Sequence, residues 1–251
     1  MKVSIEAFWL PKAGNSPEEY EDAYYPTGAP SSDVDSLRIA VADGATETSF
    51  SAAWANLLVR GYCRHVIDPD TLKTSLTTRQ SIWKRHVQKE PLPWYAEQKI
   101  ADGAFAAIIG LELHREKCRW IAFAVGDCCV FHTRGDNILA RFPLESAEQF
   151  DNRPALISSV ADNNNGVLDT IKTARGVWEP GDTFYMMSDA LAAWFLRYAA
   201  LKDTNVVGYL KTLSTRAEFA EFVSLQRGDT TTDGQPMMRN DDVTLLACVV
   251  T

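Results

Sequence analysis

Acidic residues stand at the ends of several strand-like runs in this sequence. Asp43 and Asp189 each follow such a run, whereas Asp241 precedes one. Because the end of one antiparallel strand lies beside the start of the next, these three carboxylates can converge at one edge of a sheet. Crowded carboxylates repel one another, and a bound divalent cation is the usual remedy. The spacing therefore predicts a metal site.

The ligand type indicates which metal and which chemistry to expect. Oxygen ligands select hard cations, Mg²⁺ or Mn²⁺, over zinc. Two such ions about 3.5–4 Å apart polarise a phosphate and deprotonate a bridging water, which is the chemistry of phosphoester hydrolysis. Each acid taken singly has another interpretation, because Asp is also a common turn former and helix N-cap.

Short strands and amphipathic helices must position these acids. Apolar runs bounded by Gly, Asp or Asn predict strands. The predicted strands are Val3–Trp9, Leu37–Ala42, Phe105–Leu113, Trp120–Val125, Cys129–Thr133, Thr183–Met187 and Val243–Val250. Apolar residues at helical spacing predict helices. The predicted helices are Ser51–His65, Thr71–Val87, Ala190–Leu201, Val206–Leu213 and Ala217–Gln226.

The order of these elements favours an α+β fold. The absence of a regular βαβ alternation argues against a doubly wound parallel sheet. Hairpins, one of them turning at residues 134–137, and paired helices suit antiparallel sheets with helices packed outside them. The stretch Leu144–Pro180 predicts a loop-rich, flap-like insertion over one end. No repeat or Pro-rich linker divides the 251 residues, so we expect a single domain over residues 1–251.

Charge and composition exclude several classes of protein. The net charge of -8, without a basic run, disfavours a nucleic-acid-binding surface. No run approaches 18 apolar residues, so we expect no membrane span. The N-terminal residues carry an early acid and lack the apolar core of a signal peptide. The five cysteines form no CxxC pair. We therefore expect a cytoplasmic protein with reduced thiols.

Other reactive side chains form weaker patterns. The histidines are isolated: His65, His86, His114 and His132. Cys63 and His65 lack two further ligands for zinc, and no GxSxG nucleophile elbow is present. Cys128 and Cys129 point to opposite faces of a strand, so they cannot act together on one partner. A set of tryptophans is expected to pack rather than to bind a ligand: Trp54, Trp83, Trp94, Trp120, Trp178 and Trp194.

Six short motifs follow one another along the chain. They are Tyr20-Glu21-Asp22-Ala23, Val41-Ala42-Asp43-Gly44-Ala45-Thr46, Gly103-Ala104-Phe105-Ala106, Val125-Gly126-Asp127-Cys128, Met187-Ser188-Asp189-Ala190 and Asn240-Asp241-Asp242-Val243-Thr244. In order and approximate spacing, this set resembles the metal-dependent protein phosphatases, the type 2C serine/threonine family, over nearly the whole chain.

The resemblance implies a four-layer α-β-β-α sandwich, in which two central antiparallel sheets are flanked by helices and the metal site lies in a cleft at one end. Carried over by motif, Asp43 would bridge two Mn²⁺ or Mg²⁺ ions, and the backbone carbonyl of Gly44 would bind one of them. Asp189 and Asp241 would complete the shell of the other ion. Asp127 matches the acid linked to a third, more weakly held metal.

The resemblance also implies the reaction. Glu21 and Asp22 match the Glu-Asp pair that holds metal-bound waters, and Asp22 would orient the attacking one. Water would then attack a phosphoserine or phosphothreonine directly, without a covalent phosphoenzyme. The substrate would be a phosphorylated protein, and the compact chain suggests pairing with a bacterial-type serine/threonine kinase.

The sequence departs from the family pattern at four places. Ala190 follows Asp189 where the family has Gly, and Gly103-Ala104-Phe105 replaces Gly-Thr-Thr. Asp242 stands in place of the Asn that commonly follows the last ligand.

The fourth departure concerns the substrate phosphate. The Arg expected to grip it falls at Pro17 by motif spacing. Lys12 could supply the charge, although as a point charge rather than a bidentate fork. Arg38 is a poorer candidate because it lies within a predicted strand.

These departures leave two alternatives beside an active phosphatase. The first is a catalytically weak, phosphatase-like module that binds phosphorylated partners or regulates a complex. The second is a Mg²⁺-dependent hydrolase of small phosphoesters. The retained acids favour the active enzyme, because a binding module has no need for a costly carboxylate cluster.

Overall fold

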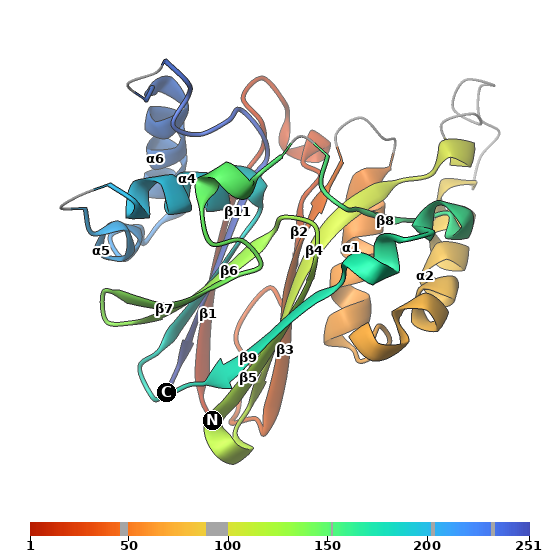
Figure 1. Cartoon of the computed structure of the whole chain (residues 1–251), viewed down its shortest axis with the longest axis horizontal. Helices are drawn as coiled ribbons and strands as arrows, with labels where there is room; N and C mark the ends of the chain where they lie inside the picture. The colour runs from red at the N-terminus through yellow and green to blue at the C-terminus, as the bar shows by residue number, and fades with distance from the viewer. Residues whose placement is uncertain (46–49, 89–99, 152, 202–203, 232–233) are drawn as a thin grey trace.

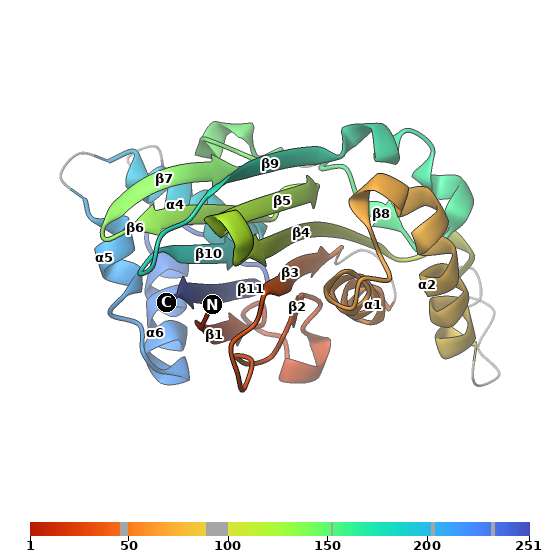
Figure 2. The ribbon, with the colours of Figure 1, turned by 90° about the horizontal axis from the view of Figure 1, so that it is seen from below.

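The computed structural model describes residues 1–45, 50–88, 100–151, 153–201, 204–231 and 234–251. Two antiparallel sheets lie face to face at its centre, and helices cover their outer faces (Figures 1 and 2). This arrangement confirms the predicted α+β class and the α-β-β-α sandwich.

Each sheet is antiparallel throughout. The first sheet has the order β1-β11-β10-β6-β7. Its strands are β1 Val3–Leu10, β6 Cys129–Arg134, β7 Asn137–Phe142, β10 Thr183–Met187 and β11 Val243–Val250. The second sheet has the order β2-β3-β4-β5-β9, and β8 pairs with β4. Its strands are β2 Ala23–Tyr25, β3 Ser36–Gly44, β4 Phe105–His114, β5 Arg119–Val125, β8 Ile157–Ser158 and β9 Lys172–Val177.

The helices divide between the two outer faces. The described α-helices are α1 Ser51–Cys63, α2 Leu72–Val87, α4 Asp189–Ala199, α5 Val206–Leu210 and α6 Arg216–Gly228. Helices α1 and α2 pack on the second sheet, and α4, α5 and α6 pack on the first. Short 3₁₀ turns are η1 Pro17–Glu19, η2 Pro69–Thr71, η3 Glu116–Cys118, η4 Ala147–Gln149, η5 Ala161–Asn164 and η6 Val167–Thr170.

Three apolar clusters fill the three spaces between the four layers. Along β3, Ile39 and Val41 pack between the sheets, whereas Ala40 and Ala42 face α1. Successive side chains of a strand point to opposite faces, so a strand covered on both sides is apolar at every position. The predicted central strands are largely of this continuous kind, whereas β1 at the sheet edge alternates with Ser4 and Glu6. Each of the seven predicted strands matches an observed strand within two residues.

Three strands of the second sheet, β2, β8 and β9, are not among the predicted strands. Strand β2 has only three residues. Strand β9 lies inside the segment predicted to be loop-rich, and it pairs only with β5 at the edge of the sheet. Four of its six residues are exposed, so its sequence lacks the apolar run that marks the central strands.

Candidate metal centre

Five aspartates lie at the same end of the sandwich. Strands β3 and β5 of the second sheet end there, and β10 of the first sheet ends there too, while β2 and β11 begin there. The acids occupy these strand ends: Asp22 before β2, Asp43 at the end of β3, Asp127 after β5, Asp189 after β10 and Asp241 before β11. The two chain termini lie at the opposite end (Figure 1). The predicted convergence of Asp43, Asp189 and Asp241 therefore corresponds to the observed topology.

Electrostatics shows that Asp43 is at the centre of this group. Burial raises the pKa of the Asp43 carboxyl well above its usual range. Four negative charges raise it further, those of Asp22, Asp189, Asp127 and Asp241. Only groups close to one another couple in this way, so the five carboxylates form one cluster.

Only one of the two carboxylate oxygens of Asp22 has a hydrogen-bond partner among the described residues. Its side chain is 2% exposed, and its Oδ2 accepts a hydrogen bond from the Thr244 hydroxyl at 2.7 Å. The Thr244 oxygen in turn contacts the Tyr20 hydroxyl, which donates to it. Oδ1 of Asp22 is buried and has no hydrogen-bond partner. A buried carboxylate oxygen without a partner is costly, and it is a ready acceptor for a water or a cation.

Asp189 has the same kind of orphaned oxygen. Its Oδ1 is buried without a hydrogen-bond partner, and its Oδ2 forms an ion pair with Nη2 of Arg239. Burial raises the pKa of Asp189, the Arg239 charge lowers it, and the charge of Asp241 raises it again, with a net rise. Asp189 is the first residue of α4, where the helix dipole favours negative charge.

Two glycines bring the backbone close to this cluster. A Cβ on Gly44 would lie 2.7 Å from the carbonyl oxygen of Glu21, so the Asp-Gly pair lets β3 approach the Glu-Asp segment. Gly126 has a φ of +95°, and a Cβ there would lie 2.5 Å from the Cβ of Ala107. Only glycine fits such a position. It turns the chain so that Asp127 reaches the site, where burial and the charge of Asp189 raise the pKa of Asp127 to about 7.

Glu21 is anchored by its neighbours. Its side chain accepts a hydrogen bond from the Ser51 hydroxyl at the start of α1. Its amide donates to Oδ2 of Asp242 at 2.6 Å, and the amide of Lys12 donates to Oδ1 of Asp242 at 2.7 Å. Asp242 therefore fastens the N-terminal segment to the start of β11. In the sequence Asp242 stands out only as a departure from the family pattern, and no spacing or motif predicts this role.

The residues considered for phosphate binding lie at different places. Lys12 lies beside the cluster through its backbone, as described above, and its side chain is half-buried. Pro17 opens the exposed turn η1 and offers no donor. Arg38 is engaged elsewhere on β3, by Glu112 at 2.9 Å and by Asp68 at 3.4 Å. Arg239, which no pattern in the sequence indicated, pairs with the carboxylate of a cluster acid, Asp189.

The altered Gly103-Ala104-Phe105 motif begins β4 at the same end. Gly103 has a φ of +86°, and the amide of Ala104 donates to the hydroxyl of Ser159 at 2.9 Å. The Ser159 hydroxyl thus accepts the hydrogen bond of this backbone amide, next to the two positions, Ala104 and Phe105, that carry no hydroxyl here.

Of the other reactive side chains, His132 lies apart from the cluster. Cys128 and Cys129 directly follow Asp127, and burial, together with the nearby acids, raises the pKa of both thiols. His132 contacts Asp182 at 2.7 Å, at the end of β6 remote from Asp127. Cys128 packs between the sheets and Cys129 packs against the helices, on opposite faces as predicted. The packed tryptophans are Trp54, Trp83, Trp120, Trp178 and Trp194, whereas Trp94 lies outside the described residues.

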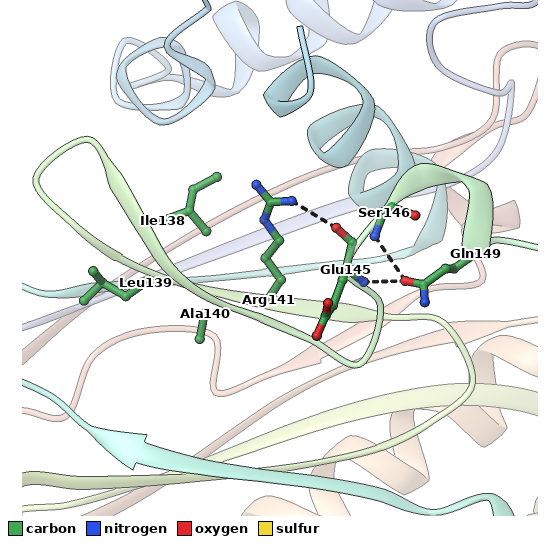
Figure 3. Close-up of a pocket in the computed structure, with 7 residues that line it drawn as sticks. All are labelled: Ile138, Leu139, Ala140, Arg141, Glu145, Ser146 and Gln149. Atoms are coloured by element: carbon green, nitrogen blue, oxygen red, sulfur yellow. Dashed lines mark hydrogen bonds between the residues drawn. The ribbon is translucent and has the colours of Figure 1, made fainter.

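A separate pocket of about 670 Å³ lies between β7 and η4 (Figure 3). Its polar groups bond to one another: Gln149 Oε1 accepts from the amides of Glu145 and Ser146, and Arg141 donates to the carbonyl of Glu145. These hydrogen bonds hold the turn that contains η4. Unlike Asp22 and Asp189, no residue that lines this pocket has a buried side-chain oxygen without a partner.

The cluster residues carry the oxygen donors that divalent cations prefer, although the side chains are not gathered closely enough to hold a cation. The donors are carboxylates, with two buried oxygens lacking partners, as hard cations prefer. Within the described ranges, no three His, Cys, Asp or Glu side chains are already gathered closely enough to hold a metal ion. For a cation to bind, the carboxylates have to move closer together, and the Arg239 guanidinium has to share Oδ2 of Asp189 or shift.

Comparison with known proteins decides the family. A family model described as protein phosphatase 2C matches residues 19–227, which is more than half of the chain. The chain belongs to the protein phosphatase 2C family. Search of curated proteins returned no match.

Solved structures show the same fold at low sequence identity. The Mycobacterium tuberculosis serine/threonine phosphatase PstP/Ppp is 12% identical with a TM-score of 0.61, covering 100% of this chain and 99% of that one. The PstP catalytic domain in complex with two manganese ions is 13% identical with a TM-score of 0.56, covering 99% and 100%. PppA, a regulatory component of the type VI secretion system in Pseudomonas aeruginosa, is 13% identical with a TM-score of 0.52, covering 100% and 99%. These likenesses bear on the fold alone. In the part of the chain that is described, no helix is both long and apolar enough to cross a membrane.

Proposed function

We propose that this protein is a metal-dependent phosphatase that hydrolyses phosphoserine and phosphothreonine in proteins. The observation that carries the proposal is the cluster of five aspartates, three of them buried, in which Asp22 and Asp189 each keep an oxygen without a partner. Membership of the protein phosphatase 2C family supports it, because the cluster uses the family's motifs in the family's order.

In this proposal some of the acids bind metal ions and the others position water molecules. Asp43, the Gly44 carbonyl, Asp189 and Asp241 would hold two Mn²⁺ or Mg²⁺ ions, with Asp43 shared by both. When bound, such ions would supply charge for the phosphate and lower the pKa of a bound water. Asp127 would hold a third, weaker ion.

Asp22 and Glu21 act on the water. The Thr244 hydroxyl fixes Oδ2 of Asp22, so its other oxygen is oriented to accept a hydrogen bond from the attacking water. That hydrogen bond aims a lone pair of the water at phosphorus. Glu21, held by the Ser51 hydroxyl, steadies a second water beside it.

The biological setting follows from the same proposal. The substrate is a phosphorylated protein of a serine/threonine kinase system, and the place of action is the cytoplasm. Three of the five cysteines are buried and all five are unpaired, as suits a reducing compartment.

An assay of hydrolysis with and without metal tests the proposal. Turnover of a phosphothreonine peptide and of p-nitrophenyl phosphate is measured with Mn²⁺, with Mg²⁺ and with EDTA. We expect turnover of both substrates with metal and none with EDTA. Metal-independent turnover would refute the mechanism. Metal binding without turnover would favour a phosphatase-like binding module, and turnover of the small ester alone would favour a hydrolase of small phosphoesters.

A further inference from the structure

Arg239 is held at the edge of the acid cluster by a fixed backbone. Its neighbour Met238 is 1% exposed in the core beneath α4 and α6, and the Met238 amide donates to the carbonyl of Gln226 at 3.1 Å. On the other side, the Arg227 guanidinium donates to the carbonyl of Asp241. The position of Arg239 is therefore set by the fold.

The Arg239 guanidinium has one side on the cluster and the other side toward solvent. Nη2 pairs with Oδ2 of Asp189, and the side chain is 45% exposed, against 11% for Asp189. Although burial lowers the pKa of Arg239, the charges of Asp189, Asp241 and Asp127 raise it overall. Among the described residues this is its one hydrogen bond. Most of its N–H groups are left to face an incoming ligand.

The other cations near the cluster are less suited to bind a phosphate. Both Nη groups of Arg227 donate to backbone carbonyls, those of Pro11 and Asp241. Arg153 and Lys172 line a cavity of about 160 Å³ beside Asp127, and both are exposed. Neither forms an ion pair with a described cluster acid.

We infer that Arg239 binds the phosphate of the substrate, in place of the arginine that Pro17 cannot supply. A guanidinium presents parallel N–H groups that match two phosphate oxygens, which an ammonium cannot do. Arg239 bonds to Asp189 through one nitrogen, so it can face the phosphate while still touching the cluster. This inference rests on the proposed function, because it names the substrate contact of the same site.

Binding of inorganic phosphate to the Mn²⁺-treated protein tests the inference without relying on turnover. Calorimetry compares wild type with Arg239→Gln, Arg239→Lys and Arg153→Gln. We expect Arg239→Gln to weaken phosphate binding by at least about tenfold, since hydrogen bonds to charged groups contribute this much. Arg239→Lys should recover only part of the loss, and Arg153→Gln should stay within about twofold of wild type, as exposed charges usually do.

Kinetic and control measurements complete the test. With a phosphothreonine peptide, Arg239→Gln should raise KM more than it lowers kcat, and circular dichroism should show an unchanged fold. Unchanged phosphate affinity in Arg239→Gln would overturn the inference, and tighter Mn²⁺ binding in that variant would then identify Arg239 as a counter-ion of Asp189. An equal loss in Arg153→Gln would also overturn it, as would a wild type that binds no phosphate. Arg239-dependent phosphate binding without any hydrolysis would support the inference and refute the proposed function.

Discussion

At the scale of single residues, the acid cluster lowers the stability of the folded protein, and a function explains why it is kept. Five carboxylates share one end of the sandwich, and burial and mutual repulsion raise the pKa of Asp43. Evolved proteins rarely keep such groups without a use for them. The ion pair with Arg239 offsets part of this cost at Asp189.

Removing one of these carboxyl charges should have opposite effects on stability and on activity. Asp43→Asn should raise the free energy of unfolding of the metal-free protein by about 1 kcal/mol or more, because it removes repulsion. Asp43→Asn and Asp189→Asn should each lower hydrolysis by more than about 100-fold, because a ligand loses its charge. Asp162→Asn, an exposed aspartate of η5, is the matched control and should change neither quantity. Full activity in both variants would remove the two-metal mechanism.

The stability of the metal-free protein should fall as the pH rises from about 4 to about 7, by on the order of 1 kcal/mol per pH unit at most from Asp127. Burial, and then the charge of Asp189, raise the pKa of Asp127 from 3.8 to about 7, so in this range the folded protein binds more protons than the unfolded chain. Urea unfolding in EDTA at several pH values measures the slope. Asp127→Asn should flatten it, and an equally steep slope in that variant would assign the effect to other groups.

At the scale of elements, tight turns carry the acids from the strands into the site. The turn between β5 and β6 depends on Gly126, which has both a positive φ and a neighbour within 2.5 Å of its missing Cβ. Gly181 has nearly the same φ, +94°, with nothing within 4 Å. An alanine at Gly181 would therefore meet backbone strain alone, whereas an alanine at Gly126 would meet both backbone strain and a steric clash.

Gly126→Ala should destabilise the protein more than Gly181→Ala. Both variants pay for the positive φ, about 1 kcal/mol, but only Gly126→Ala also forces Ala107 aside, for about 1–3 kcal/mol more. Thermal and urea unfolding compare the two. Equal losses in both variants would show that the turn at Gly126 relaxes freely and does not fix Asp127.

The sequence predicted the central elements and most of the acids, for reasons that are visible in the structure. Strands such as β10 and β11 are covered on both faces, so their apolar runs are continuous and easy to recognise. Strand β9 is exposed on one side at the edge and gave no such signal. Asp43, Asp189 and Asp241 could be found because strand ends are visible in sequence. The contacts of Arg239 and Asp242 could not be predicted from the sequence. Arg239 pairs with a residue 50 positions away, and Asp242 accepts from backbone amides more than 200 positions away.

At the scale of the whole molecule, the acid cluster spans both sheets. Asp43 lies in β3 and Asp22 directly precedes β2, both of the second sheet, whereas Asp189 and Asp241 adjoin strands of the first. Cations bound among them would therefore tie the two sheets together at this end.

Metal should accordingly stabilise the folded protein as a unit. At Mn²⁺ concentrations about 100 times the dissociation constant, the free energy of unfolding should rise by about 2.7 kcal/mol for each site. Calorimetric melting with Mn²⁺ and with EDTA measures this, and Asp43→Asn should lose most of the gain while Asp162→Asn keeps it. Equal gains in the two variants would place the bound ions elsewhere.

The most direct test of the central claim is the position of bound metal in a crystal. Anomalous scattering recorded from crystals grown with Mn²⁺ should give two peaks that share the carboxylate of Asp43, with Gly44 on one ion and Asp189 and Asp241 on the other. Crystals of the active protein with no peak at Asp43, or with peaks only at other acids, would contradict the account.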